Sequence, residues 1–157
     1  MNYEEIKQTK KPVPVKYKTL WLNTIDGVAS ADRKSFAFNN LPLIQIRNKS
    51  ILKINSITLS GAGLGSASNH NWTIKMQNIK FNQTSYFNSD NDNNPTIACI
   101  NYDTNNSIQN GKYSLELTPQ DINQPILHIV SDDGHGAIKN SQAIDFYISI
   151  CIEEYEL

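Results

Sequence analysis

The stretch "AIDFYISICIEEY", residues 143–155, alternates large apolar side chains with mostly polar ones along nearly all of its length. Successive side chains of a β-strand point to opposite faces of its sheet, so this alternation predicts a strand with one buried face. The expected core face consists of Ile144, Phe146, Ile148, Ile150 and Ile152, and the opposite face of Asp145, Tyr147, Ser149, Cys151 and Glu153.

The same period of two recurs along most of the chain. Further strands are predicted at 17–24, 35–38, 42–48, 51–60, 72–81, 95–102, 108–117 and 125–131. Within 51–60 and 72–81 the apolar residues change parity part of the way along. A change of parity moves side chains to the other face of the sheet, and its simplest cause within one strand is a β-bulge.

Two short motifs suggest local structure between these strands. Asn110-Gly111 is a strong signal for a β-hairpin turn, and Leu115 and Leu117 after it continue the alternation. The segment "TPQDIN" (118–123) is the one candidate for helix, because Thr118 could cap it and Pro119 could occupy its first helical position.

These signals together predict an all-β fold, an antiparallel jelly-roll or Greek-key sandwich of about eight strands. The connections at 61–71, 82–94 and 131–142 are too long for tight hairpins, and long connections between two sheets are typical of jelly-roll wiring. With 157 residues the chain has the length of one domain, which we assign to residues 17–157.

Residues 1–16 are predicted to form an extended N-terminal arm. Lysines alternate with polar residues here, and Pro12 and Pro14 favour an extended path. Such a segment is either a frayed terminus or an arm that docks on a neighbouring subunit.

The composition argues against several classes of partner. The formal net charge is −1, so no overall attraction to nucleic acid or to an anionic membrane is expected. The longest apolar-rich stretch, residues 143–152, is too short to span a bilayer. The first residues contain no apolar core of a secretory signal, so Cys99 and Cys151 are expected to remain free thiols in a reducing cytoplasm.

The stretch "SGAGLGSASNH" (60–70) is the nearest approach to a phosphate-binding loop. A dinucleotide loop needs G-x-G-x-x-G between a strand and a helix, whereas Gly61, Gly63 and Gly65 are spaced by two and precede a predicted strand. A loop between strands, whose small residues could pack against a neighbouring subunit, explains these glycines better.

Two acidic segments could hold a cation but have simpler explanations. In "SDNDNNP" (89–95), Asp90, Asp92 and Asn94 are spaced as in a calcium loop, but the glycine and the distal glutamate of an EF-hand are missing. In "SDDGHG" (131–136), Asp132, Asp133 and His135 are explained by turns in which side chains bond to the backbone.

No arrangement of reactive side chains in the sequence identifies a catalytic site. No two of His70, His128 and His135 have the spacing of a zinc or cupin site, and no serine lies in a nucleophile elbow. We therefore expect a protein that is not an enzyme and that has no catalytic, metal-binding or cofactor-binding residues.

Aromatic side chains offer one alternative route to ligand binding. Sugars stack on exposed aromatic rings, although packing in the core is the commoner fate of a tryptophan in a strand. The candidates for such a role are Trp21, Trp72, Tyr86 and Tyr102.

Four segments together resemble a known family. They are the basic arm, "FAFNNLPLIQIRNKSILKINSITL" (36–59), "YSLELTPQDINQPILHIVSD" (113–132) and "AIDFYISICIEE" (143–154). Over residues 17–155 the pattern resembles the small single-jelly-roll structural proteins of large double-stranded DNA viruses, virophages and polinton-like viruses. The family has no catalytic or binding motif, so the resemblance assigns no site residues.

The resemblance implies a structural subunit of a viral capsid, as a penton or a minor capsid protein. Its partners would be other copies of itself and larger capsid proteins, with no specific nucleic acid, and it would form a homo-oligomer. It would be made in the host cytoplasm and reside in the virion. A lectin-like carbohydrate-binding or adhesion module is the alternative from a different functional class.

Overall fold

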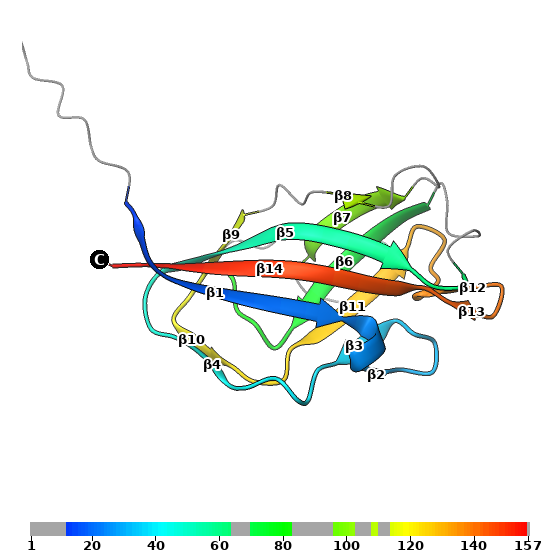
Figure 1. The fold of residues 1–157 in the computed structure, drawn as a ribbon, viewed down its shortest axis with the longest axis horizontal. Helices are drawn as coiled ribbons and strands as arrows, with labels where there is room; N and C mark the ends of the chain where they lie inside the picture. Colours follow the sequence, from blue (N-terminus) through cyan, green and yellow to red (C-terminus); the bar gives the residue numbers. More distant parts are fainter. Residues whose placement is uncertain (1–11, 64–69, 83–95, 103–107, 110–113, 157) are drawn as a thin grey trace, which may run out of the picture.

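The computed structural model describes residues 12–63, 70–82, 96–102, 108–109 and 114–156. These residues form two antiparallel sheets that pack face to face (Figure 1). The only helical segment among them is the single turn η1 (Thr24–Asp26). The prediction of an all-β antiparallel protein is therefore confirmed. Gly65, Tyr86, Asp90, Asp92, Asn94 and the Asn110-Gly111 turn lie outside the described residues.

The first sheet has the strand order β1–β14–β5–β8, and β9 pairs with another part of β5. Its long strands lie side by side as one layer (Figure 1). Its strands are β1 (Pro14–Asn23), β5 (Ser50–Ser60), β8 (Ile108–Gln109), β9 (Ser114–Leu117) and β14 (Asp145–Tyr155).

The second sheet has the strand order β2–β3–β11–β6–β7, and two small ribbons, β4–β10 and β12–β13, complete the fold. The strands of the second sheet are β2 (Val28–Ala29), β3 (Ser35–Ala37), β6 (His70–Gln77), β7 (Thr96–Tyr102) and β11 (Ile126–Ser131). The ribbons are formed by β4 (Ile44–Ile46), β10 (Gln120–Ile122), β12 (Ile138–Lys139) and β13 (Gln142–Ala143).

The strand β14 lies inside the first sheet, between β1 and β5. The five core residues predicted for 143–155, which include Phe146, are all fully buried. The ring of Phe146 meets Trp72 of β6 edge to face, with ring centroids 5.4 Å apart. This contact joins the two sheets, so the core lies between them.

The bulge expected within 51–60 is confirmed at Asn55. Ser56 pairs with Ser149 and Ile54 with Ile150, which leaves Asn55 as one extra residue in β5. Because of this residue, Leu52 and Ile54 before it and Ile57 and Leu59 after it all face the core. Asn55 itself is exposed.

The change of parity in 72–81 has a different cause, and the expectation of a bulge there is wrong. The strand β6 ends at Gln77, and Asn78 adopts a left-handed backbone conformation with φ of 64°. This turn, and not an inserted strand residue, brings Ile79 back into the core. A bulge does occur in the pairing of β6 with β7, where Ile97 is the extra residue.

The strands β8 and β9 lie on either side of Asn110-Gly111, whose predicted turn lies outside the described residues. Both strands run antiparallel to β5, one against Ile57 and Thr58 and the other against residues 50–53. The two strands therefore run in the same direction and cover two separate parts of one edge of β5.

The helical turn expected at 118–123 is replaced by a strand. Residues 120–122 form β10, which pairs with β4 through Gln120↔Ile46 and Ile122↔Ile44. Ile122 is buried in the common core, so pairing and burial outweigh the local helix signal of Thr118 and Pro119.

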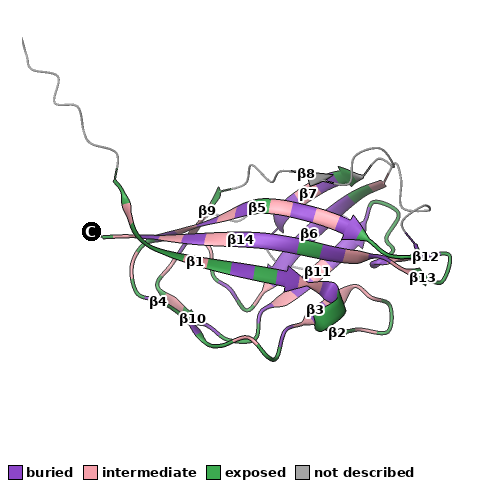
Figure 2. Cartoon of the chain, in the orientation of Figure 1, coloured by how far each residue is buried: buried purple, intermediate pink, exposed green. Residues whose placement is uncertain are grey.

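The first strand begins earlier than its sequence suggests. The strand β1 starts at Pro14, which pairs with Tyr155, and Lys16 pairs with Glu154. Residues 14–16 of the expected arm thus belong to the sheet at its edge. Burial alternates along β1, with the even residues Leu20 and Leu22 in the core and the odd residues outside (Figure 2).

Candidate functional site

The exposed large apolar side chains of the described residues gather around the edge strand β1. Four belong to β1 or precede it, two follow it in η1 and β2, one contacts it from β14, and one faces its edge from the segment before β4. We call this set the β1 surface: Val13, Val15, Tyr17, Trp21, Ile25, Val28, Leu43 and Tyr147. Figure 2 shows β1 at the edge of the first sheet, with exposed residues along it.

Two aromatic rings form the centre of the β1 surface. Trp21 is 58% exposed, and its ring stacks on that of Tyr147 with centroids 5.8 Å apart and an interplanar angle of 25°. The other strand tryptophan, Trp72, is fully buried. Among the aromatic residues considered for sugar binding, Trp21 is thus exposed and Trp72 serves the core.

A groove of about 700 Å³ follows the open edge of β1 and separates it from β4. Apolar side chains from both sides line it, and Lys16 and Arg47 give it a basic rim. Lys18 reaches across the groove, where its ammonium donates a hydrogen bond to the carbonyl oxygen of Gln45. The same ammonium lies 3.1 Å from the carboxylate of Glu154.

Glu154 is a buried acid at the inner end of this groove. Its carboxylate accepts hydrogen bonds from the backbone N–H of Arg47, at 3.0 Å, and from that of Asn48. Burial raises the pKa of Glu154, but the bonds from Arg47 and Lys18 lower it more, so the pKa lies below its ordinary value. A carboxylate at this position holds β1, β14 and the 47–48 segment together.

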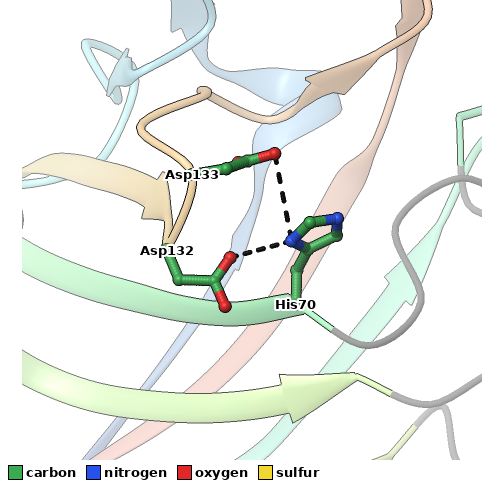
Figure 3. Close-up of side chains that lie close together, drawn as sticks. All are labelled: His70, Asp132 and Asp133. Atoms are coloured by element: carbon green, nitrogen blue, oxygen red, sulfur yellow. Dashed lines mark hydrogen bonds and ion pairs between the residues drawn. The ribbon is translucent and has the colours of Figure 1, made fainter.

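A second cluster of titratable groups consists of His70, Asp132 and Asp133 (Figure 3). Nδ1 of His70 is 2.8 Å from Asp132 and 3.9 Å from Asp133. Both aspartates follow β11, and His70 begins the neighbouring β6. Three such groups within reach of one another could in principle hold a metal ion.

The partners of the two aspartates show that their oxygens are already used within the fold. Asp132 accepts a hydrogen bond from the backbone N–H of Asn71 in addition to its contact with His70. Asp133 accepts hydrogen bonds from Ser131 and from the mostly buried Lys139. The geometry is that of a turn fastened to a strand end, in line with the simpler explanation from the sequence.

The pKa values of the two aspartates support this interpretation. The backbone hydrogen bond from Asn71, followed by that from His70, lowers the pKa of Asp132. Burial raises the pKa of Asp133, but its hydrogen bonds from Lys139 and Ser131 outweigh burial, and the pKa lies well below its usual range. Both groups are therefore held as carboxylates by their neighbours.

His70 and His135 both lie near Asp133, whereas His128 lies elsewhere in the second sheet. His135 lies 3.2 Å from Asp133 on the outer side of the turn, and His128 shares a hydrogen bond with Ser35 on β3. The spacing of these residues in the sequence did not predict that His70 lies beside the 131–136 segment. Only the register of β11 with β6, which sets Ser131 opposite Trp72, brings His70 to Asp132.

Neither Cys99 nor Cys151 forms a disulfide bond, as expected. Cys99 lies on β7 in the second sheet and Cys151 on β14 in the first. Burial raises the pKa of both thiols, so neither has the lowered pKa that marks a reactive cysteine.

The glycines at 61–63 serve close packing between backbones. The N–H of Gly63 donates a hydrogen bond of 2.9 Å to the carbonyl of Ala143. A Cβ atom at Gly63 would overlap the carbonyl oxygen of Gln142, and one at Gly61 would lie 2.6 Å from that of Ala143. These two glycines let the end of β5 lie against residues 142–143.

No family model matches this chain, and searches of curated proteins and of solved structures found none that matches it. Within the described ranges, no helix combines the length and the apolar character needed to cross a membrane.

Proposed function

We propose that this chain is a structural subunit of a viral capsid, a penton or minor capsid protein with a jelly-roll fold. It acts by assembling with copies of itself and with larger capsid proteins. It is made in the host cytoplasm and resides in the virion.

The observation that carries this proposal is the β1 surface. An exposed apolar patch of more than a few hundred Å² is uncommon on a monomeric protein and marks a site of interaction. Here the exposed large apolar side chains of the described residues lie on β1, in the segments that directly precede and follow it, or beside it on β14 and before β4. The N-terminal segment precedes β1 in the chain and is therefore attached to the same edge.

The fold gives further support. Two antiparallel sheets around one core are compatible with the jelly roll that the family resemblance implies. The ionisable clusters around Glu154 and Asp133 are engaged in fastening strands and turns, which suits a protein that works as a rigid building block.

The direct test is to look for the chain in virus particles. Particles should be purified from cells infected with the virus that encodes it, and labelled with antibodies against the folded protein. Regular labelling of intact particles supports the proposal. A chain that is abundant in the infected cell but absent from washed particles contradicts it.

A truncation tests the contribution of the N-terminal segment. Since β1 begins at Pro14, removal of residues 1–11 spares the sheet, and the urea midpoint of unfolding should stay unchanged. Incorporation into particles should fall, because a docked arm supplies contacts to a neighbour. A variant in which residues 1–11 are replaced by Gly and Ser controls for length, and normal incorporation of both variants contradicts a docking role.

A lectin-like carbohydrate-binding or adhesion module is the second candidate, favoured by the exposed stack of Trp21 on Tyr147. Aromatic faces of this kind bind the apolar face of a sugar ring. Binding of the purified protein to a glycan array, lost in Trp21→Ala and kept in Val28→Ala, would establish this function. An array without any binding removes the candidate.

A further inference from the structure

We propose that the open edge of β1 pairs with the β1 of a second copy, antiparallel, around a two-fold axis that passes between the two Thr19 residues. The inference deepens the proposed function and rests on its premise that the chain acts by assembling with copies of itself. It adds the surface through which two copies meet and the register in which their β1 strands pair.

The outer edge of β1 is available for pairing. Among the described strands, β1 pairs with β14 alone, and no backbone hydrogen bond between described residues satisfies its other edge. An open strand edge offers a row of N–H and C=O groups to another strand. Pro14, which lacks an N–H, limits such pairing to the part of β1 from Val15 onward.

The side chains of β1 select one register. Paired residues of antiparallel strands lie on the same face, so a symmetric pairing must be centred on a residue and not between two. Centring on Lys18 would place Lys18 against itself, and centring on Tyr17 would place Lys16 against Lys18. The register centred on Thr19 has no opposed lysines and has the longest remaining overlap, residues 15–23.

In this register the exposed apolar residues meet their counterparts. Tyr17 lies opposite Trp21 of the second copy on the outer face, and each Trp21 keeps its stack on Tyr147. Each Trp21 then lies between Tyr147 of its own copy and Tyr17 of the second copy, so that two rows of three rings lie on either side of the axis. Cross-strand aromatic pairs are among the stabilising contacts in antiparallel sheets.

Three residues of the β1 surface lie within the proposed overlap of residues 15–23. They are Val15, Tyr17 and Trp21, which are 48%, 62% and 58% exposed. Lys18 is the charged residue closest to the axis. Its ammonium already forms an ion pair with Glu154 and a hydrogen bond to the carbonyl oxygen of Gln45.

Sedimentation equilibrium of the full chain tests the inference. Wild type should be a dimer, and Thr19→Lys, which opposes two lysines at the axis, should raise the dimer dissociation constant at least about tenfold. Asn55→Lys is the matched control, because Asn55 is exposed on the same sheet and the change in charge is equal. Its dissociation constant should equal that of wild type.

A cross-link tests the register without relying on a disruptive charge. Thr19 lies opposite Cys151 within one chain, so Thr19→Cys is introduced into a Cys99→Ser, Cys151→Ser background. Mild oxidation should give a covalent dimer with Thr19→Cys and none with Asn55→Cys. A wild type that is monomeric up to about 0.1 mM, equal effects of the two lysine variants, or cross-linking through Asn55→Cys alone would each overturn the inference.

The outcome of the sedimentation and cross-linking experiments is independent of the outcome of the test on virus particles. A dimer through β1 in a protein that no particle contains would refute the capsid role and leave the pairing standing. A chain found in particles but monomeric and not cross-linked through residue 19 would refute the pairing and leave the capsid role.

Discussion

Glu154 illustrates how a single charged residue can join several elements of an otherwise apolar fold. It lies on β14 beside the core, yet it is 2% exposed and remains a carboxylate. Two backbone N–H groups and Lys18 compensate for its burial. The end of the sequence, "IEEYEL", gives no sign that this glutamate differs from its neighbours, because the donors come from distant segments.

Replacement of Glu154 by Gln should therefore destabilise the protein. The variant leaves Lys18 without its counter-charge and weakens two bonds to the backbone, and charged hydrogen bonds contribute about 1.5–3 kcal/mol each. We expect a loss of that order in the free energy of unfolding, measured in urea. Glu156→Gln, at an exposed position, is the control, and equal stability of the two variants contradicts this role.

The stability of the 131–139 turn should depend on pH through Asp133. Its pKa is lower in the folded protein than the value near 3.9 of an unfolded aspartate. The stabilisation is therefore complete above that value and declines as the pH falls below it. Asp133→Asn should unfold at lower urea than wild type at pH 7, and the difference should shrink towards pH 3. Curves that stay parallel from pH 7 to pH 3 would contradict the assignment.

At the scale of the element, the sequence predicted the strands but only some of the irregularities within and after them. Alternation located nearly every long strand, because burial of one face leaves a period of two in the sequence. The parity change at Asn55 was correctly assigned to a bulge, while the similar change after Met76 comes from a left-handed turn at Asn78. Both devices shift parity by one residue, so the pattern alone does not distinguish them.

Deletion of Asn55 should be far more damaging than its substitution. Without the extra residue, either Leu52 and Ile54 or Ile57 and Leu59 must turn away from the core. Exposing two such side chains costs roughly 3–6 kcal/mol, at 1.5–3 kcal/mol each. Asn55→Ala should lose less than about 1 kcal/mol at this exposed site. A deletion variant as stable as Asn55→Ala in urea would contradict the bulge.

One element was mispredicted because long-range pairing overrode a local signal. The 118–123 segment has a helix-like start, but Ile122 is buried against the core through pairing with β4. Local propensities are weak compared with such burial.

At the scale of the whole molecule, the sequence predicted the class of fold and the core but not the surface. That Trp21 is exposed while Trp72 is buried depends on which strand is at the edge. Edge position follows from the strand order β1–β14–β5, which alternation does not contain. The β1 surface, and with it the proposed interface, is therefore visible only in the assembled fold.

The number of copies in a purified particle is the measurement that tests the capsid proposal most directly. It can be obtained by quantitative mass spectrometry against an isotope-labelled standard of this chain. A subunit of an ordered shell must occur in a fixed number, in constant ratio to the larger capsid proteins across preparations and after washing in high salt. A ratio that varies between preparations, or that falls to zero on washing, would contradict the account.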